Sequence, residues 1–482
     1  MGPMVLDPDA AYLAIKARDA RFDGRLFVGV TSTGVYCRPV CRVRTPRREN
    51  CRFFDTPAQA EAAAFRPCLK CRPEIAPGLS AMDSSRQLAD TAARAIEHAV
   101  HAGEPFALPA LAARLGVTDR HLRRIFQAQH GVSPHDYLST QRLLLAKQLL
   151  TDTAQPVTQV ALASGFGSLR RFNAAFVERY RLKPSQLRRE GAEPAEGAPL
   201  RLAYRPPYDV EGALGFFAQR QIAGVEQVEG LAMRRTLAWP HRGHELRGWV
   251  EARFVPERHE VHLTTAPGLA PVLGAVLQAV RQGLDLDADP ARIDPVLADL
   301  PGAPGTRLPN GLDTFELAVR VILGQQVTVK AARTLTERLV QRFGRPVDTP
   351  FPALGRLFPD AATLAAAEAD AIGSLGIVRQ RVKALQALAA AVADGRIALH
   401  RGAPLEPTLA ALLELPGIGH WSVQLIAMRA LAWPDAWPAS DIGLMNALGT
   451  RDVREVTARG EAWRPWRAYA VMRLWRQLET GT

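Results

Sequence analysis

Apolar residues recur at helical spacing along most of the chain, and short alternating runs appear only near its middle. Residues 308–478 carry Ala and Leu at a period of about 3.6, with Gly and Pro at the breaks, which predicts successive amphipathic helices. Alternating apolar and polar residues at 253–255 and 260–263 predict strands. The pattern therefore predicts a multidomain protein that is mainly α, with α+β parts.

Breaks in this pattern divide the chain into four blocks. All the cysteines lie in residues 1–80, whereas residues 84–190 are helical and rich in Arg. A stretch of Gly, Ala, Glu and Pro at 191–199 predicts a linker. An α+β block at 200–305 and an all-helical block at 306–478 follow it. Four domains agree with a length of 482 residues, at roughly 100–200 residues per domain.

Two helix-turn-helix passages follow one another in the second block. Helices are expected at 108–115 and 157–164, each followed by a Gly turn and a second helix that begins at a hydroxyl cap, Thr118 or Ser168. A connecting helix is expected at 141–150. Each second helix is expected to bury one apolar face: Leu122, Ile125 and Phe126 in the first, and Leu169, Phe172 and Phe176 in the second.

The opposite face of each second helix is basic and suits the DNA major groove. The alternative is that these faces are simply solvated, but two such passages in tandem favour DNA binding. The side chains expected to face DNA are Arg120, Arg123, Arg124, Arg170, Arg171 and Asn173.

Four of the five cysteines have the spacing of a zinc site. Cys37, Cys41, Cys68 and Cys71 form two close pairs separated by a loop, and each pair can hold one edge of a tetrahedron. The fifth, Cys51, has no partner at ligand spacing and is interpreted as a packed thiol. One interpretation of the site is purely structural. Nearby basic residues favour a second interpretation, in which the site lies against DNA and these residues contact phosphate. They include Arg44, Arg66 and Lys70.

Charge suggests how such a site would report damage. Four thiolates on Zn²⁺ carry a net charge of −2, and their sulfurs remain nucleophilic. Transfer of a methyl group to one sulfur would reduce that charge to −1, weaken repulsion from DNA phosphate and raise DNA affinity.

The C-terminal block contains a DNA-binding signature and a carboxylate. The string L-P-G-I-G at 415–419 predicts a helix-hairpin-helix, in which Gly417 and Gly419 let backbone N–H groups approach a phosphate. Asp441 follows about twenty residues later and precedes an apolar run. Such an Asp is commonly a helix cap, so a structural role is the alternative to catalysis.

Composition narrows the classes of partner. The formal net charge of +12 favours a polyanion such as nucleic acid. No stretch approaches the roughly 20 apolar residues that span a bilayer, and residues 1–20 lack a signal-peptide core. We therefore expect a cytoplasmic, nucleoid-associated protein with no membrane partner.

The N-terminal half resembles two known families. The strings V-Y-C-R-P-V-C at 35–41 and F-R-P-C-L-K-C at 65–71 resemble the N-terminal domain of Ada-type alkylation-response proteins. That resemblance implies that Cys37 accepts a methyl group from a DNA methylphosphotriester and ligates one zinc with the other three cysteines. The second block resembles the AraC-type DNA-binding domain over nearly its whole length, including Y-R-L-K-P-S at 180–185.

The C-terminal half is similar to the helix-hairpin-helix glycosylase superfamily, and within it to AlkA-type DNA-3-methyladenine glycosylases. The strings Y-R-P-P-Y-D at 204–209, I-L-G-Q-Q-V at 322–327 and W-R-P-W-R at 463–467 carry this resemblance. It implies that Asp441 is the essential carboxylate and that aromatic side chains hold a cationic base. It also implies a monovalent cation at the hairpin. The base pocket is assigned to Trp421, Trp466, Phe216 and Leu425.

Some positions depart from the family patterns. The wedge residue falls on Gln326 and the pocket tyrosine falls on Leu425. Trp421 occupies the position of the Lys nucleophile of strand-cutting relatives, which implies a monofunctional enzyme that leaves an abasic site. No iron–sulfur cluster is expected, because no cysteine follows Cys71.

The leading hypothesis is a fusion of a methyl sensor and transcription regulator with a glycosylase for alkylated bases. We expect it to act as a monomer on double-stranded alkylated DNA and promoter DNA. One alternative is an alkylation-responsive regulator whose C-terminal half binds DNA without catalysis. Another is a glycosylase that its N-terminal half merely tethers to DNA.

Overall fold

A computed structural model describes residues 7–18, 22–23, 26–74, 81–102, 106–152, 155–190, 199–241, 244–400 and 403–480. The expected linker lies outside these ranges except for Pro199. Contacts within the structure divide the chain into two compact units: Met1–Ala93 with Ala107–Tyr137, and Arg94–Phe106 with Leu138–Thr482. This division passes through α3 (Ala81–Ala102) and α6 (Pro134–Asp152), so the expected block boundaries stay predictions.

The first part of the chain folds around a small sheet with strand order β3-β1-β2-β4. The central strand β1 is antiparallel to β2 and β3, whereas β2 is parallel to β4. Parallel strands end at the same edge of a sheet, so this pairing brings the ends of β2 and β4 together. The elements are α1 (Pro8–Lys16), β1 (Phe27–Val30), β2 (Val35–Cys37), β3 (Cys51–Phe54), α2 (Pro57–Ala62) and β4 (Arg66–Pro67).

The helix-turn-helix passages form as the sequence predicts, with one exception. Thr118 and Ser168 cap α5 and α8 by accepting backbone N–H groups, and the expected connecting helix is the longer α6. Leu169 was expected to be buried but is 39% exposed, because it begins α8 and its side chain lies before the first full turn. The remaining helices are α4 (Leu108–Arg114), α5 (Asp119–His130), α7 (Val157–Ala163), α8 (Leu169–Tyr180) and α9 (Pro184–Glu190).

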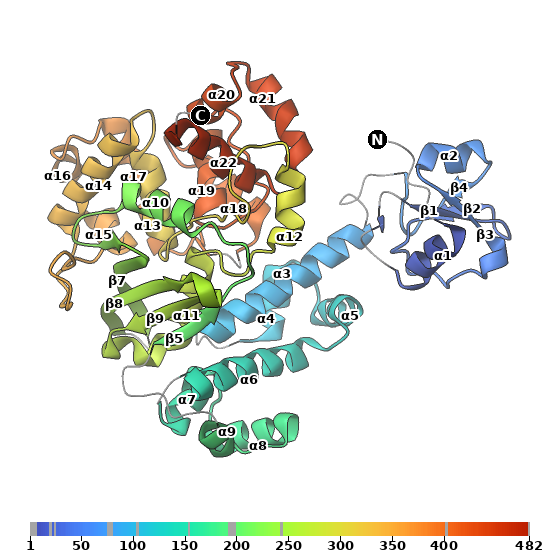
Figure 1. The fold of residues 1–482 in the computed structure, drawn as a ribbon, viewed down its shortest axis with the longest axis horizontal. Helices are drawn as coiled ribbons and strands as arrows, with labels where there is room; N and C mark the ends of the chain where they lie inside the picture. The colour runs from blue at the N-terminus through green and yellow to red at the C-terminus, as the bar shows by residue number, and fades with distance from the viewer. Residues whose placement is uncertain are drawn as a thin grey trace. The chain divides into compact units, whose positions relative to one another are not determined.

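An antiparallel sheet of order β5-β9-β8-β7-β6 follows in the middle of the chain (Figure 1). Both strands expected from alternation are present, the first as the end of β8 and the second within β9. The elements are β5 (Leu200–Ala203), α10 (Val210–Arg220), β6 (Glu226–Glu229), β7 (Ala232–His241), β8 (His244–Val255), β9 (Glu260–Thr265), α11 (Leu273–Gly283) and α12 (Pro290–Ile293).

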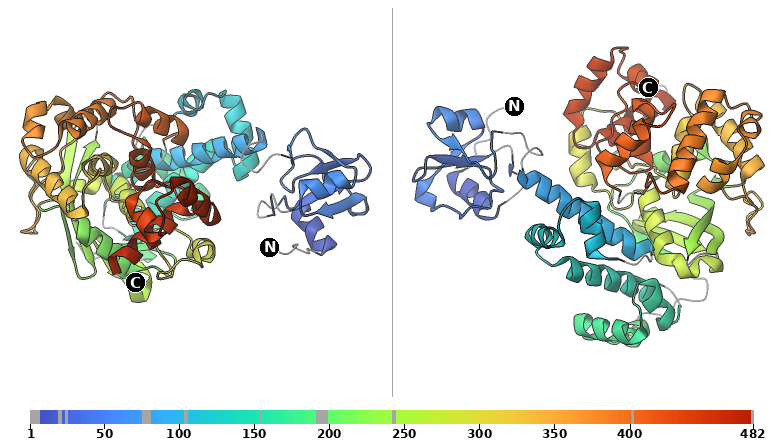
Figure 2. Two further views of the ribbon diagram at one scale, coloured as in Figure 1. Left: turned by 90° about the horizontal axis from the view of Figure 1, so that it is seen from above. Right: turned by 180° about the vertical axis from the view of Figure 1, so that it is seen from behind.

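The remaining helices gather into one bundle beside that sheet, as Figures 1 and 2 show from three directions. One hydrophobic core runs through the bundle and includes Phe216 from α10. The helices are α13 (Thr314–Leu323), α14 (Val329–Phe343), α15 (Ala361–Ala366), α16 (Ala369–Gly373), α17 (Arg379–Ala393), α18 (Leu405–Leu413), α19 (His420–Arg429), α20 (Ile442–Ala447), α21 (Val453–Gly460) and α22 (Arg467–Thr480).

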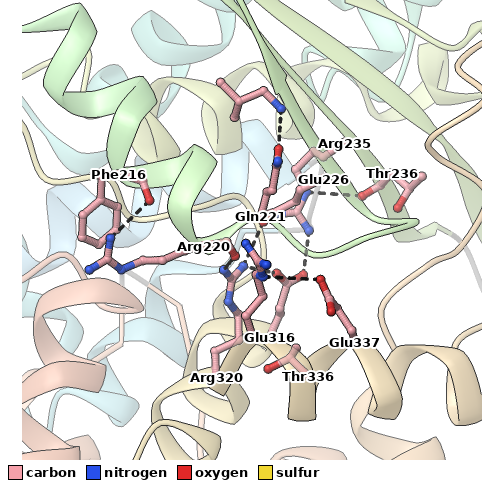
Figure 3. A network of polar contacts seen from close by, with 12 residues as sticks. Phe216, Arg220, Gln221, Glu226, Arg235, Thr236, Glu316, Arg320, Thr336 and Glu337 are labelled. Atoms are coloured by element: carbon pink, nitrogen blue, oxygen red, sulfur yellow. Dashed lines mark hydrogen bonds and ion pairs between the residues drawn. The ribbon is translucent and has the colours of Figure 1, made fainter. Parts of the chain in front are cut away.

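A buried ion network joins the sheet to the bundle (Figure 3). Arg235 on β7 pairs with Glu226 at 2.8 Å and with Glu316 on α13 at 2.7 Å. Arg320, one turn along α13, lies 3.0 Å from each of the same two glutamates. Each charged group therefore has two neighbours of opposite charge, and these offset the large free-energy cost of removing the group from water.

Candidate functional site

The four cysteines with zinc-site spacing meet at one edge of the small sheet. Cys37 ends β2 and Cys68 directly follows β4, so the parallel pairing places them side by side. The other two lie on the turns that follow. All four thiols are buried, and their sulfur atoms lie within 4.8 Å of one another. Sulfurs about 3.8 Å apart fit the tetrahedron set by zinc–sulfur bonds of about 2.3 Å, so this site suits a zinc ion.

The basic residues around this site differ in their exposure. Arg44, Arg66 and Lys70 are exposed, as phosphate contacts require. Arg38, which follows the first cysteine, is instead 1% exposed and forms an ion pair with Asp23. It therefore supports the fold of the cysteine loop and does not face DNA.

Cys51 lies apart from the four-cysteine site. Its side chain is buried in β3, and its sulfur donates a hydrogen bond to the Arg47 carbonyl at 3.2 Å. Burial raises the pKa of the Cys51 thiol, so this sulfur is a poor nucleophile.

The basic faces of α5 and α8 are exposed. Arg123 on α5 forms an ion pair with Asp119 at 3.0 Å, one turn earlier, and Arg124 contacts His121. On α8, Arg170 and Arg171 are exposed in the first turn, the part of a recognition helix that meets base edges. Both helices therefore present guanidinium groups to solvent while their apolar faces are buried.

A cavity of about 1160 Å³ opens in the C-terminal bundle. Its mouth is formed by exposed side chains from α14, α17 and α20 or the loops before them: Gln326, Val327, Val329, Val378 and Ile442. The rest of the lining combines apolar side chains with polar and charged ones, among them Arg381, Ser422 and Asp441. A cavity of this kind holds a small flat ligand by burial and orients it through those polar groups.

Asp441 lies in this cavity and also begins α20. Its Oδ1 accepts the backbone N–H of Leu444 at 3.0 Å and the indole N–H of Trp475 at 2.9 Å. Its Oδ2 accepts the indole N–H of Trp421 at 2.9 Å. The carboxylate is 7% exposed. Helix capping and a place in the cavity therefore coexist, because an ionised carboxylate accepts several hydrogen bonds at once.

The predicted hairpin lies between α18 and α19. Gly417 adopts φ +77°, and a Cβ there would lie 3.2 Å from the Cβ of Ala384, so only glycine fits without strain. Gly419 precedes α19 as its cap residue. The first N–H groups of α19 thus have no carbonyl of their own helix to bind, which suits them to a DNA phosphate.

The loop that carries Gln326 is fixed to this hairpin. The side chain of Gln325 donates to the Gly417 carbonyl and to the Ser422 hydroxyl, both at 2.9 Å. Gln326 itself is exposed at the cavity mouth and adopts φ +53°. Its side chain therefore projects from a backbone conformation that is strained for a residue other than glycine, next to the anchored Gln325.

The residues predicted to hold a base are placed differently from one another. Trp421 and Leu425, one turn apart on α19, line the cavity. Phe216 lies behind it, with its ring parallel to that of Trp475 at a centroid distance of 6.5 Å. Trp466 packs against Tyr469 and is not among the described residues that line the cavity.

Two features of the site were not predicted from the sequence. Trp475 on α22 lines the cavity and donates to Asp441, whereas Trp466, which is predicted to line the base pocket, does not line the cavity. Arg429, at the end of α19, also lines the cavity. In the sequence, each of these residues resembles any other residue of an amphipathic helix. Its position in the cavity is therefore known only from the packing of the helices.

Family models match four consecutive segments of the chain. They are described as the metal binding domain of Ada (residues 10–74), a helix-turn-helix domain (111–190), the AlkA N-terminal domain (199–313) and HhH-GPD superfamily base excision DNA repair protein (319–455). No helix among the described residues is long and apolar enough to cross a membrane.

Similar proteins cover the chain in whole or in part. It is 38% identical to the probable bifunctional transcriptional activator/DNA repair enzyme AlkA of Mycobacterium tuberculosis (strain CDC 1551 / Oshkosh), over 98% of this chain and 97% of that protein. DNA-3-methyladenine glycosylase 2 of Escherichia coli is 35% identical over 57% of this chain and 95% of its own length. The Escherichia coli enzyme Ada is 34% identical over 33% of this chain and 43% of its own length. The chain therefore belongs to the AlkA family of bifunctional transcriptional activator/DNA repair enzymes.

Proposed function

We propose that the C-terminal half excises alkylated bases from double-stranded DNA by hydrolysing the N-glycosidic bond. One observation carries this proposal: a buried carboxylate, Asp441, lies in a cavity beside the hairpin that would bind the DNA backbone. The size of the cavity, and a lining that offers both apolar side chains and hydrogen-bonding groups, suit a base that has left the duplex. DNA-3-methyladenine glycosylase 2, which the chain resembles over this half, supports the choice of substrate.

In this mechanism the DNA backbone binds first and the damaged nucleotide then rotates into the cavity. Backbone N–H groups after Gly417 and Gly419 hold a phosphate, and Gln326 fills the space that the base leaves in the stack. Rotation costs a few kcal/mol, and least where damage has already weakened pairing. Gln325 keeps the wedge and the hairpin in register, because its amide binds hairpin atoms directly.

Asp441 then stabilises the positive charge that develops on deoxyribose as the bond to the base breaks. Its two indole donors hold the carboxylate in one orientation before the substrate arrives. A charge fixed in advance in a water-poor site stabilises a transition state far more than the same charge in water. Water completes the reaction and leaves an abasic site, since no lysine occupies the position of Trp421.

We propose that the N-terminal part repairs methylphosphotriesters and reports them. The Cys37 sulfur attacks the methyl carbon, so that a sulfur–carbon bond forms and the methyl–oxygen bond breaks. The phosphodiester oxygen leaves with the bonding electron pair. A bound zinc ion would keep all four sulfurs as thiolates. Cys71 is the less reactive candidate, because its sulfur accepts the Arg38 N–H at 3.4 Å.

The methylated form would then bind promoter DNA through the helix-turn-helix passages. Loss of one negative charge beside the exposed Arg44, Arg66 and Lys70 lowers repulsion from phosphate. Arg123 and Arg124 on α5, and Arg170 and Arg171 on α8, are placed on exposed helix faces for the major groove. A monovalent cation at the hairpin, the monomeric state and the absence of an iron–sulfur cluster stay predictions.

Replacement of the carboxylate tests the glycosylase. Asp441→Asn should abolish release of 3-methyladenine and 7-methylguanine from methylated duplex DNA, measured by chromatography of the free bases. Because asparagine also caps helices well, the fold and DNA binding should persist. The matched control is Asp452→Asn, which changes an exposed cap residue at the start of α21 and should retain full activity.

This experiment also separates the two leading hypotheses. A regulator that binds DNA without catalysis would release no base in either the parent or the variant. Release at the parent rate by the Asp441 variant would refute the catalytic assignment.

Mass spectrometry tests the methyl acceptor. After incubation with methylphosphotriester DNA, the parent protein should carry one additional methyl group, on Cys37. Cys51→Ser should gain the same group, because Cys51 lies outside the four-sulfur site. A methyl group found only on Cys51 would contradict the sensor assignment.

A further inference from the structure

The loop that carries Gln326 is held, one residue earlier, by two other elements. The Gln325 side chain donates to the Gly417 carbonyl and to the Ser422 hydroxyl, both at 2.9 Å. Its backbone carbonyl accepts a hydrogen bond from the guanidinium of Arg381, in the first turn of α17. Gln325 is therefore fixed through its side chain by the hairpin and through its backbone by α17.

The start of α17 packs against the same hairpin. A Cβ on Gly417 would lie 3.2 Å from the Cβ of Ala384 and 3.4 Å from the carbonyl oxygen of Gln380. Val382 and Ala384 of this helix are buried. Arg381 therefore extends from a helix whose position is tied to the hairpin, and its hydrogen bond ties the loop to both.

Gln326 depends on such support. It adopts φ +53°, a left-handed conformation that is strained for a residue other than glycine and persists only where the surroundings hold it. Its side chain is exposed at the cavity mouth and gains little packing there. Two residues later, Thr328 caps α14 by accepting the Ala331 N–H at 3.2 Å. The conformation of Gln326 is therefore set by the backbone anchors that flank it.

We propose that Arg381 is a positioning residue for base flipping. By binding the Gln325 carbonyl, it keeps Gln326 in the conformation that enters the space left by the flipped base. A side chain in that space must resist closure of the base stack, and a loop ordered beforehand does so without a further entropy cost. This inference rests on the proposed glycosylase function and adds a residue that acts through Gln326.

A direct phosphate contact is the alternative role for this arginine. Arg381 is partly exposed and lines the cavity, and no Asp or Glu within the described ranges forms an ion pair with it. A phosphate contact would act independently of Gln326 and would add to the salt dependence of DNA binding. A positioning residue acts only while Gln326 is present and leaves the salt dependence unchanged.

A double-mutant cycle tests the inference. Single-turnover excision of 7-methylguanine from one duplex is measured for the parent, Arg381→Met, Gln326→Gly and the double variant. Glycine removes the wedge side chain and adopts positive φ without strain. Arg381→Met alone should slow excision about tenfold, near the lower end for loss of a hydrogen bond from a charged donor. In the Gln326→Gly background the same change should slow it less than about twofold, because no wedge is left to position.

A salt titration and a control variant complete the test. The logarithm of affinity for a duplex with a tetrahydrofuran abasic site is plotted against the logarithm of salt concentration. Arg381→Met should keep the parent slope, whereas loss of one phosphate contact would reduce it by about 0.9. Arg396→Met, which removes an exposed arginine paired with Asp394, should excise at the parent rate. If Arg381→Met does not fold, Arg381→Gln, also neutral, takes its place.

The outcomes separate this inference from the function on which it rests. If the parent releases the base but Arg381→Met slows excision equally in both backgrounds, or not at all, Arg381 is not a positioning residue. A shallower salt slope would identify a phosphate contact and would also overturn the inference. If the parent releases no base and behaves like Asp441→Asn, the glycosylase proposal fails and this inference fails with it. A loss confined to proteins that retain Gln326, with an unchanged slope, supports the inference.

Discussion

At the residue scale, the central feature is a carboxylate held by two indole groups from different helices. Trp421 on α19 and Trp475 on α22 donate to separate oxygens of Asp441, each at 2.9 Å. These hydrogen bonds hold the carboxylate in one orientation, which it would not keep if it could rotate freely. Orientation of this kind is worth most where the group acts through its charge.

Removal of one indole donor should slow the reaction without weakening DNA binding. Trp475→Phe keeps an aromatic ring beside Phe216 but loses the N–H to Oδ1. We expect single-turnover excision to fall about 10- to 100-fold, the range for a hydrogen bond to a charged group worth about 1.5–3 kcal/mol. The control is Trp437→Phe, which loses an indole bond to the Val456 carbonyl away from the cavity and should keep its excision rate. Equal losses in both variants would contradict a positioning role for Trp475.

At the scale of elements, the hairpin between α18 and α19 links backbone conformation to DNA binding. Gly417 is left-handed, packs closely on α17 and provides a carbonyl for Gln325. One glycine therefore fixes both the turn and the loop that carries the wedge residue.

Gly417→Ala should weaken both stability and DNA affinity. The left-handed backbone alone costs an alanine roughly 1–2 kcal/mol, and contact with Ala384 at 3.2 Å would displace the hairpin. Urea unfolding and titration with abasic-site duplex measure the two effects. Gly395→Ala is the matched control, because it has φ +71° with nothing within 4 Å of the added Cβ. Equal loss of DNA affinity in both variants would show that the hairpin position is not special.

At the scale of the whole molecule, charge acts in two ways. The surplus of basic residues favours DNA binding that weakens as salt rises. In the interior, the network of Arg235, Arg320, Glu226 and Glu316 joins the middle sheet to the C-terminal helices. The cavity lies against this joint, since Arg320 belongs to both.

This buried network should make the C-terminal half sensitive to acid. Burial alone would raise the pKa of Glu316, but Arg235 and Arg320 lower it below its ordinary value. A carboxyl whose pKa is depressed by folding stabilises the native state above its unfolded pKa, about 4.3, and loses that contribution as pH falls through its folded pKa. Unfolding free energy should therefore decline below about pH 4.3.

Glu316→Gln should remove this dependence and destabilise the protein at neutral pH by about 3–5 kcal/mol, the typical cost of breaking a buried pair. Urea unfolding at pH 7 and at acid pH measures both effects. Glu455→Gln, which alters an exposed pair with Arg459, should change neither. A variant as stable as the parent at pH 7 would show that the network contributes nothing to the joint.

Local signals in the sequence account for much of the site. The spacing of Cys37, Cys41, Cys68 and Cys71 predicted the four-sulfur cluster, and Thr118 and Ser168 marked the starts of their helices. Gly417 and Asp441 were both singled out from the sequence, and the structure shows that both line one cavity. Each of these features depends on neighbours within a few residues or on a short fixed interval.

Other features were decided by packing between distant segments. Trp475 and not Trp466 reaches Asp441, although both lie near the end of the chain in helical patterns. Arg38 is buried against Asp23 although its neighbours Arg44 and Arg66 are exposed. The position of Arg429 at a helix end predicts a solvated side chain, but its guanidinium lies near Phe216 on α10 and Arg320 on α13.

Sequence alone thus predicted many of the elements, the families and the cysteines that cluster in the structure. Helix periodicity, glycine conformations and cysteine spacing are local properties that survive without knowledge of the rest of the chain. Which aromatic and charged groups share the cavity was decided only by the tertiary structure. The reason is that the apolar faces of several helices pack into one core. The arrangement of the helices that buries these faces best also decides which polar groups at their edges come into contact.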